Sequence, residues 1–588
     1  MKIKINKNHI WANTFVNQLA AIGVKLACMS PGSRSTPLIY SLAENKKIKC
    51  FVNIDERSSA YFALGLAKAS GTPVVIVTTS GTATAELYPA IIEAYQQRTP
   101  LIICTADRPP ELVGTGANQT ITQHNIYRNH IRLFRDVGLP SIKEHSLNYL
   151  QKIALKAFKI SVTQKGPVHI NFPFAKPLEP FSLDNEIDKK LLKSQPIIES
   201  IKDTHNIKIE SDRKVIKLAE KIVQFEKGLI IAGPMENDSE AVKNIIALAS
   251  LTKYPLFADG VSYLRFKKLK SIKNIISNYN SFLTSKIFCA KYKPDLILHF
   301  GGTPTSANLL NYLSECDAER FQINEYGDLN DPSRKTKMIF KYSAELFSKT
   351  LIAHIKKEEF IRIQSKWLNT FTSAESISEK LTSGILDKEK KLHEPKIITE
   401  LLKVLPSTTN LFIGNSLPIR DFDCFSGSST KKINLYFNRG ASGIDGLVST
   451  ALGVASIKEP TVLLVGDLSF LHDLNSLLIA KNYNIPLLII VINNNGGGIF
   501  KTLPISKKKK LLRECFIAPQ NMNTKLMVEA FGINYRLIKN KNELKSTFEN
   551  LEIENPLVLE IQTSADESAN LRNEIFSSVK TEIENQFS

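Results

Sequence analysis

The chain of 588 residues lacks any uninterrupted apolar run of membrane-spanning length, and its seven cysteines include no C-x-x-C pair. A transmembrane helix needs about 20 consecutive apolar residues, so we expect no membrane span. Scattered, unpaired cysteines are typical of a reducing compartment rather than of a disulfide scaffold. The first residues also lack the apolar core of a signal peptide. We therefore expect a cytoplasmic protein.

Acidic residues are too few to balance the basic ones, and the formal net charge is +19. Such an excess can indicate a nucleic-acid or membrane partner. The one dense basic run is Lys507-Lys508-Lys509-Lys510, and no zinc-finger or RNA-binding motif accompanies it. We interpret this run as a solvated or lid-like segment, and we expect no nucleic-acid partner.

The pattern of apolar strands and amphipathic helices predicts an α/β protein with three doubly wound parallel-sheet domains. At this length one core is not enough, and we assign the domains to residues 1–183, 184–355 and 356–588. Charged connections are expected at 183–214 and 356–391. The clearest helix patterns lie at 57–69 and 83–97. The clearest strand patterns lie at 25–29, 49–54, 74–79, 101–105, 168–172, 228–232, 255–258, 296–300 and 486–492.

A candidate metal motif lies in the third domain. Gly466-Asp467-Leu468 follows one apolar strand, and Asn494 follows the next, 27 residues after Asp467. Neighbouring parallel strands end at the same sheet edge, so these side chains should meet. The oxygens of Asp467, Asn494 and the Gly496 backbone suit a hard cation such as Mg²⁺ that also binds phosphate. The alternative is an ordinary strand-to-helix turn.

Polar clusters also follow successive strands of the first domain, at the edge where such sheets bind ligands. They occupy residues 30–34, 55–57, 80–82 and 107–109. Glu56 follows a buried strand and is a candidate for a carboxylate in a partly desolvated site. Alternatively, it is a helix N-terminal acid favoured by the helix dipole.

Several strings resemble the 2-succinyl-5-enolpyruvyl-6-hydroxy-3-cyclohexene-1-carboxylate synthases of menaquinone biosynthesis, which are thiamine-diphosphate enzymes. They are SPGSRSTPL at 30–38, DERS at 55–58, TSGTA at 79–83, ADRPPEL at 106–112, GANQTI at 116–121 and NRGASGIDG at 438–446. The resemblance runs nearly end to end. The strings at 106–112 and 438–446 are more specific than the metal motif, which the whole superfamily shares.

This resemblance implies thiamine diphosphate with Mg²⁺ or Mn²⁺ as cofactors. Glu56 would protonate the aminopyrimidine ring, and Ile444 would support the bent cofactor; both are assigned as catalytic. Asp467, Asn494 and Gly496 would hold the metal. The implied cofactor contacts are Ser80, Gly440, Ser442, Ile444, Leu468, Ser469, Ile499 and Phe500.

The same resemblance implies 2-oxoglutarate as donor and isochorismate as acceptor, both carboxylates that arginines would bind. The implied substrate contacts are Ser33, Arg34, Arg108, Asn118 and Gln119, mainly for the acceptor, and Asn415, Ser416, Arg420, Arg439 and Phe500 for the donor. One position departs from the family pattern. Where relatives carry a Lys or Arg in the middle domain, this chain has Ser306-Ala307-Asn308.

The resemblance further implies a homodimer, or a dimer of dimers, with each cofactor between the first domain of one subunit and the third of its partner. Two alternatives remain open at this point. The first is another thiamine-diphosphate decarboxylase or an acetolactate-synthase-like ligase. The second is a non-catalytic basic binding protein on the same scaffold.

Overall fold

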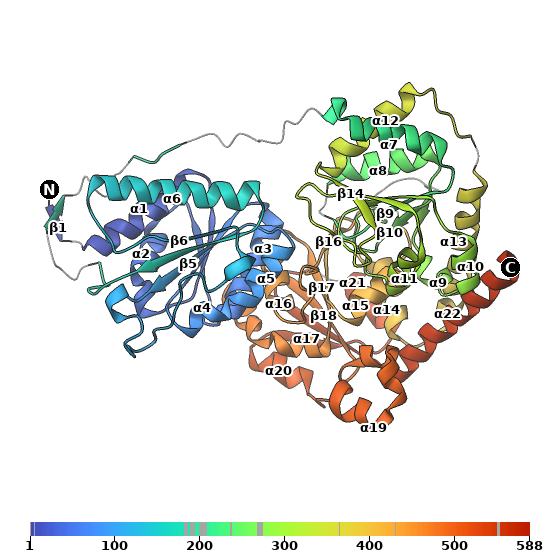
Figure 1. Ribbon diagram of the computed structural model, residues 1–588. Helices are drawn as coiled ribbons and strands as arrows, with labels where there is room; N and C mark the ends of the chain where they lie inside the picture. The colour runs from blue at the N-terminus through green and yellow to red at the C-terminus, as the bar shows by residue number, and fades with distance from the viewer. Residues whose placement is uncertain are drawn as a thin grey trace.

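The computed structural model describes residues 2–4, 6–180, 186–188, 195–198, 209–235, 238–266, 274–363, 365–429, 431–549 and 553–588. Three six-stranded sheets follow one another along the chain, and every strand pair within them is parallel. Helices cover the sheets in each domain (Figure 1). The predicted α/β class with three doubly wound sheets is confirmed, and each sheet falls inside one predicted domain range.

The first sheet has the strand order β3-β2-β4-β5-β7-β6. Its strands are β2 (Leu26–Met29), β3 (Lys49–Val52), β4 (Val74–Thr78), β5 (Leu101–Asp107), β6 (Leu133–Asp136) and β7 (Pro167–Pro173). Its helices are α1 (Lys7–Ala21), α2 (Thr36–Glu44), α3 (Glu56–Ser70), α4 (Thr82–Glu86), α5 (Tyr88–Gln96) and α6 (Glu144–Thr163). The single helix predicted at 83–97 is wrong: Pro89 lies in the first turn of α5, and a proline inside a continuous helix would clash with the preceding turn.

The second sheet has the order β11-β10-β9-β12-β13-β14. Its strands are β9 (Gly228–Ala232), β10 (Leu256–Ala258), β11 (Ile275–Ile276), β12 (Leu296–Phe300), β13 (Glu319–Ile323) and β14 (Thr336–Phe340). Its helices are α7 (Arg213–Gln224), α8 (Ser239–Thr252), α9 (Tyr279–Phe282), α10 (Lys286–Lys291), α11 (Ala307–Glu315) and α12 (Ala344–Lys357). Helix α12 packs on α7 and α8.

The third sheet has the order β16-β15-β17-β18-β20-β19. Its strands are β15 (Asn410–Ile413), β16 (Asn434–Tyr436), β17 (Thr461–Gly466), β18 (Leu487–Asn493), β19 (Asn534–Leu537) and β20 (Leu557–Gln562). Its helices are α14 (Glu394–Val404), α15 (Leu417–Phe425), α16 (Leu447–Ala455), α17 (Asp467–His472), α18 (Leu477–Asn482), α19 (Lys509–Leu511), α20 (Thr524–Ala530), α21 (Lys541–Glu549) and α22 (Ala565–Phe587). Apart from the sheets, β1 (Lys2–Lys4) pairs antiparallel with β8 (Glu186–Asp188).

The charged connection predicted at 356–391 is largely helix, which corrects that prediction. Helix α13 (Lys366–Lys388) occupies most of it, and Trp367 and Phe371 are buried in an apolar cluster with residues of the middle domain. A sparse apolar stripe is enough for a helix when a neighbouring domain covers it. Much of the other predicted connection, 183–214, lies outside the described residues.

The first and third domains share one apolar core. Helices α3 and α16 lie side by side (Figure 1), and Phe62 and Leu66 belong to the same buried cluster as Leu447 and Leu452. The helices approach closely because glycines meet at their crossing. A Cβ on Gly65 would overlap the Thr450 carbonyl oxygen, so only glycine allows this separation.

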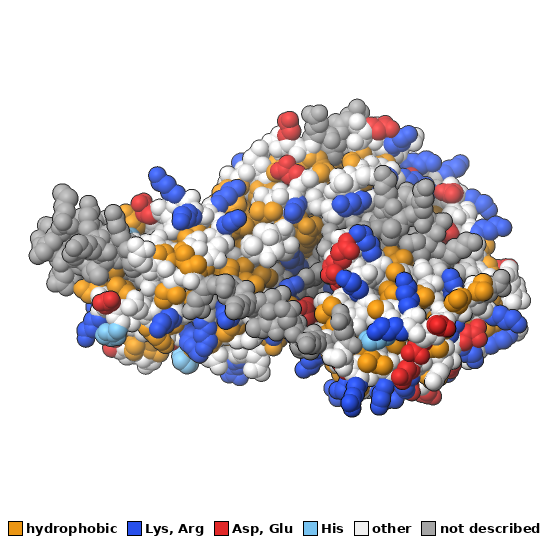
Figure 2. Space-filling view, turned by 90° about the horizontal axis from the view of Figure 1, so that it is seen from above, with side chains coloured by type: hydrophobic (Ala, Val, Ile, Leu, Met, Phe, Trp, Pro, Cys, Tyr) orange, Lys and Arg blue, Asp and Glu red, His pale blue; other side chains and the backbone are white. Residues whose placement is uncertain are grey.

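Charged side chains of both signs lie on the surface of the protein (Figure 2). Figure 2 shows basic side chains distributed over the visible face among acidic and apolar ones, rather than in one continuous band. Among the described residues, no helix is both long and apolar enough to cross a bilayer. All seven cysteines are free thiols.

Candidate active site

The predicted metal ligands meet at the carboxyl edge of the third sheet. Asp467 begins α17 directly after β17, and Asn494 follows the adjacent strand β18. The Asp467 carboxylate accepts hydrogen bonds from the backbone N–H groups of Gly496, at 2.7 Å, and Leu468, at 2.9 Å. Asp467 therefore holds the glycine loop against its own helix.

The donor set fits a hard cation. The Asn494 Oδ1 atom is buried without a hydrogen-bond partner, whereas its Nδ2 donates to Glu394 at 2.7 Å. Burial raises the pKa of Asp467 to about 6, and hydrogen bonds from the backbone of Gly496, Leu468 and Asn495 oppose that rise. The described residues contain no cluster of three or more His, Cys, Asp or Glu side chains that could hold a metal. Asp467, Asn494 and the Gly496 carbonyl would hold Mg²⁺ or Mn²⁺ together with a diphosphate.

Glu56 lies where the first domain meets the third. It is the first residue of α3, which Asp55 caps by accepting a hydrogen bond from Ser58 N. Burial raises the pKa of Glu56, so its acid form persists to higher pH than in a free glutamate. The next residue, Arg57, donates to the His472 carbonyl at 3.0 Å, at the end of α17. Glu56 therefore starts the helix that contacts the far end of the metal-site helix.

The loop 439–446 of the third domain is held by side chains of the first. Glu93 accepts hydrogen bonds from Gly440 N, at 2.8 Å, and Ala441 N, at 2.6 Å. Tyr61, five residues after Glu56, donates to Asp445 at 2.5 Å. Between these anchors, Ile444 leaves 38% of its surface exposed. An exposed isoleucine in an otherwise anchored loop suits an apolar support for a bound ring.

Ser442 lies in the same loop with a φ of +61°, and its N–H points to Glu93 at 3.3 Å. Nearby in sequence to the metal ligands, Ser469 is buried and Leu468 half-buried. Ile499 and Phe500 follow the glycine loop and are half-buried, and Phe500 packs edge-on against Phe516. Leu468 and Ser469 are thus next to the metal ligand Asp467, and Ile499 and Phe500 directly follow the glycine loop.

These contacts between the first and third domains are made here within one chain. The family resemblance, in contrast, implies that the first domain of one subunit meets the third domain of its partner at each cofactor. Because a single chain is described, the assembly stays a prediction.

Four of the five predicted donor residues lie at the start of α15 or in the loop 439–446: Asn415, Ser416, Arg420 and Arg439; the fifth, Phe500, follows the glycine loop. Asn415 donates to the carbonyls of Asn438 and Gly443, both at 2.7 Å, and accepts from Arg439 at 3.4 Å. Arg420 donates to the Ser416 carbonyl at 2.6 Å. Burial and the nearby charge of Arg439 both lower the pKa of Arg420. Two neighbouring guanidinium groups of this kind are suited to a carboxylate.

Helix α15 is fixed from two sides by buried ion pairs. Asp421 pairs with Arg572 of the last helix, α22, at 2.6 Å. Asp423 pairs with Arg265 of the middle domain at 2.9 Å and accepts from Gly260 N at 2.8 Å. The helix that carries Arg420 is therefore anchored both to α22 of its own domain and to the middle domain.

The predicted acceptor residues lie on loops of the first domain. Arg34 is buried, donates to the Phe174 carbonyl at 2.6 Å, and has a buried Nε without a partner. Burial, followed by the charge of Arg108, lowers the pKa of Arg34. Arg108 donates to the Asn118 carbonyl at 2.9 Å. These arginines are close enough to influence each other, and both suit an anion.

The Ser80 turn and Gln119 hold each other reciprocally. Gln119 donates to the Ser80 carbonyl at 2.9 Å, and the Ser80 hydroxyl donates to the Gln119 carbonyl at 3.0 Å. Ser33, in a short helical turn before α2, is exposed. All of the predicted acceptor residues are thus carried by the loops that follow strands of the first sheet or lie against them.

The residues at the departure from the family pattern have a local role. Ser306 caps α11, and Asn308 donates to the Asn280 carbonyl at 2.9 Å. Lys501 is paired with Asp566, whereas the run Lys507 to Lys510, which we interpreted as solvated or lid-like, is exposed. No replacement for the missing basic contact is identified among these described residues.

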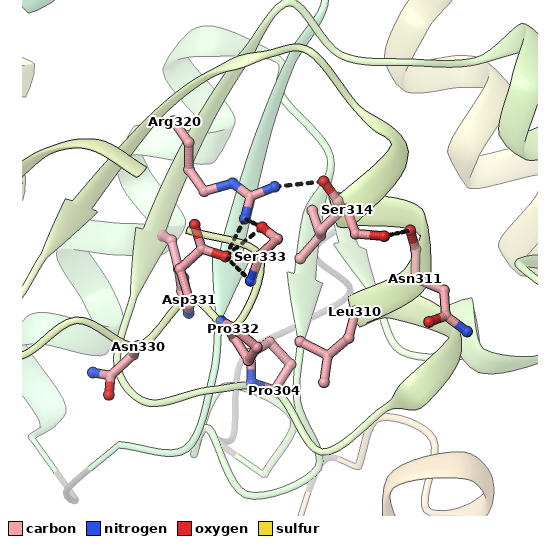
Figure 3. Close-up of a pocket in the computed structure, with 11 residues that line it drawn as sticks. Pro304, Leu310, Asn311, Ser314, Arg320, Asn330, Asp331, Pro332 and Ser333 are labelled. Atoms are coloured by element: carbon pink, nitrogen blue, oxygen red, sulfur yellow. Dashed lines mark hydrogen bonds and ion pairs between the residues drawn. The ribbon is translucent and has the colours of Figure 1, made fainter. Parts of the chain in front are cut away.

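A cavity of about 210 Å³ lies in the middle domain (Figure 3) and contains none of the predicted site residues. Arg320 lines it and is held by Asp331 at 2.7 Å and by the Leu313 carbonyl at 2.6 Å. Burial lowers the pKa of His299, another lining residue, to about 4. Because none of the predicted site residues lines this cavity, we do not assign the reaction to it.

Sequence reasoning missed two buried carboxylates that hold the site. Glu93 anchors the loop 439–446, and Glu394 holds the Asn494 amide. The role of Glu93 could have been suspected from the sequence. It lies on the apolar face of a helix beside Ile91 and Ala94, where an unpaired acid is rare. Glu394 had none, since 100 residues separate it from Asn494.

Comparisons with known proteins assign all three domains. Residues 11–126 match a model described as "Thiamine pyrophosphate enzyme, N-terminal TPP binding domain", residues 199–413 "Middle domain of thiamine pyrophosphate", and residues 428–561 the "C-terminal TPP binding domain" of such enzymes. Curated relatives named 2-succinyl-5-enolpyruvyl-6-hydroxy-3-cyclohexene-1-carboxylate synthase share 37% identity in Bacillus cytotoxicus, 36% in Listeria monocytogenes and 35% in Geobacillus kaustophilus. These alignments cover 98%, 94% and 98% of both chains, respectively.

Proposed function

This chain belongs to the 2-succinyl-5-enolpyruvyl-6-hydroxy-3-cyclohexene-1-carboxylate synthases, a family of thiamine-diphosphate enzymes, and on that premise we propose its reaction. The protein decarboxylates 2-oxoglutarate and adds the remaining succinyl unit to isochorismate by conjugate addition, releasing carbon dioxide. The contact of α3 with α16 carries the proposal, because Tyr61 of α3 donates to Asp445, the neighbour of Ile444, and Arg57 of α3 donates to the end of α17, the helix that begins with Asp467.

Each part of the site has a role in this reaction. When bound, thiamine diphosphate supplies a carbon nucleophile and stabilises the charge left by decarboxylation. Glu56 holds a proton at the aminopyrimidine-binding position, and its raised pKa keeps that proton available. Ile444 presents an apolar surface to the cofactor. Asp467, Asn494 and Gly496 hold Mg²⁺ or Mn²⁺ and thereby the diphosphate.

The substrates are positioned by two pairs of arginines. Arg420 and Arg439 bind the distal carboxylate of the donor, and Asn415 orients Arg439. Arg34 and Arg108 bind the carboxylates of the acceptor, since each presents a guanidinium at the edge of the first sheet. A bidentate arginine–carboxylate pair fixes orientation as well as binding.

We also propose a cytoplasmic homodimer, or a dimer of dimers. Seven free thiols are compatible with a reducing compartment. In a two-fold symmetric assembly the α3–α16 surfaces could be exchanged between copies, giving two equivalent sites.

Product analysis tests the reaction. Purified protein with thiamine diphosphate and Mg²⁺ is given 2-oxoglutarate and isochorismate, and the product is identified by mass spectrometry. Pyruvate replaces 2-oxoglutarate in a parallel reaction. We expect an adduct of isochorismate that carries the succinyl unit, with carbon dioxide released in equal amount. Acetolactate formation from pyruvate, without reaction of isochorismate, would refute the proposal in favour of an acetolactate-synthase-like ligase.

A further inference from the structure

Three consecutive asparagines follow β18, and each is held by a different partner. Asn493 donates to Glu560 at 2.6 Å, Asn494 donates to Glu394 at 2.7 Å, and Asn495 donates to Asn521 at 2.8 Å. Of the three, only Asn494 has a buried side-chain oxygen without a hydrogen-bond partner. Its amide is therefore satisfied on the nitrogen side and open on the oxygen side.

The chemistry of Glu394 fixes which way this amide points. An ionised carboxylate only accepts hydrogen bonds, so it must face the NH₂ group of Asn494. The oxygen of the same amide is then directed away from Glu394. With a neutral amide as neighbour, either orientation of Asn494 would be possible, because the two ends have nearly the same shape.

Glu394 is itself held in place by a buried arginine. It is 1% exposed, and its second oxygen accepts a hydrogen bond from Arg572. Arg572 in turn makes two hydrogen bonds to Asp421, at 2.7 and 2.6 Å. The N–H of Glu394 also donates to the Ser568 hydroxyl at 3.3 Å. A buried charge with these partners has little freedom to turn.

We propose that Glu394 is a positioning residue that orients the Asn494 amide, so that its oxygen and not its nitrogen faces the divalent cation. This inference rests on the proposed function, which assigns Asn494 to the metal. Glu394 does not touch the cation in this scheme. It acts through Asn494, as hydrogen-bond partners of metal ligands commonly do.

A reciprocal exchange of carboxylate and amide tests the proposal. In Glu394→Gln, the new amide oxygen pairs with Arg572, its NH₂ faces Asn494, and the Asn494 amide turns its nitrogen toward the cation. In Asn494→Asp, two carboxylates face each other. In the double variant, the introduced amide at position 394 donates to the introduced carboxylate at position 494, whose other oxygen is free to bind the metal. The complementary pair is thus restored in reverse.

The measurement is the affinity for Mn²⁺ in the presence of thiamine diphosphate, from the spin-resonance signal of free Mn²⁺, with thermal melting in chelator as a check on folding. We expect each single variant to bind about 10- to 100-fold more weakly, and the double variant to recover most of that loss. Asn495→Asp is the matched control. It adds the same charge one residue away, where the partner is an amide, and should bind normally.

Asp467→Ala separates the two levels of the proposal. If it loses Mn²⁺ while Glu394→Gln and Asn494→Asp keep it, the role of Glu394 is overturned and the metal site stands. If Asp467→Ala keeps Mn²⁺, the metal site and the inference both fail. Losses that multiply in the double variant also overturn the inference. Should Glu394→Gln fail to fold, Asn494→Asp decides: tighter or equal binding contradicts the proposal, because an anionic ligand alone should bind better.

Discussion

A single substitution at the glycine crossing between α3 and α16 should change the geometry of the site. A Cβ on Gly65 would overlap the Thr450 carbonyl and lie 2.9 Å from the Gly453 Cα atom. The added Cβ would lie 2.0 Å from that oxygen. Ordinary carbon–oxygen contacts are about 3.3–3.6 Å, so Gly65→Ala requires the helices to separate by roughly 1.5 Å. Both obstructing groups are backbone atoms, and no side chain can turn away to relieve the overlap.

This separation should reduce both stability and turnover. Overpacking of this kind costs about 1–3 kcal/mol. A misplacement of about 1 Å between reacting groups can lower the rate by roughly 10²-fold. We expect cofactor affinity to change much less, because the proposed diphosphate and metal contacts lie in the third domain. The assays are turnover, thermal melting and calorimetric titration of thiamine diphosphate with Mg²⁺.

Gly384→Ala is the matched control for this prediction. Gly384 also lies inside a helix, α13, but a Cβ there would meet no atom within 4 Å. Removing a glycine from such a position should stabilise the protein by about 0.5–1 kcal/mol and leave turnover unchanged. The reasoning is refuted if Gly65→Ala retains the turnover and melting temperature of the unmodified protein, or if both alanine variants behave alike.

The remaining predictions concern the proposed chemistry and assembly. Glu56→Gln should lower turnover by about 10²–10⁴-fold with little change in cofactor affinity, and near-normal turnover would contradict its role as proton donor. Because burial raises the pKa of Glu56, the alkaline decline in turnover should lie above the usual value of 4.5 and be absent from the residual activity of Glu56→Gln. Arg420→Ala and Arg439→Ala should lower the selectivity for 2-oxoglutarate over pyruvate by roughly 10- to 150-fold, because a charge-assisted hydrogen bond is worth about 1.5–3 kcal/mol. Equal losses of turnover with both donors would show that these side chains do not bind the distal carboxylate. Co-expressed Glu56→Gln and Asp467→Ala chains should recover roughly a quarter of the activity if sites form between subunits, and inactive mixed dimers would place each site within one chain.

The buried strands were predictable because parallel strands covered on both faces are continuous apolar runs. The ranges predicted at 228–232 and 296–300 coincide with β9 and β12. Local pattern was a poorer guide where long-range packing decides. The sequence did not predict helix α13, because it lies in a charged segment. The apolar face of this helix is buried against residues of the middle domain such as Leu229 and Phe257, which are distant in sequence.

The site could be predicted where its residues lie beside strand ends, and not where a distant side chain acts on them. Asp467 and Asn494 follow adjacent strands, so topology alone brings them together. The partner of Asn494 begins a helix 100 residues earlier, and only the fold brings it into contact. Motif reading thus finds groups that touch a ligand more readily than groups that hold them.

The two ion pairs of α15 limit how the enzyme could be simplified or redesigned. Asp421 pairs with α22 and Asp423 pairs with the middle domain. The middle domain therefore helps to hold Arg420 in position, even though it carries none of the assigned residues. A two-domain version without it would leave Asp423 and its neighbours facing water. Donor preference should therefore be altered by exchanging side chains on a stationary α15, since the helix has no independent room to shift toward a shorter or longer substrate.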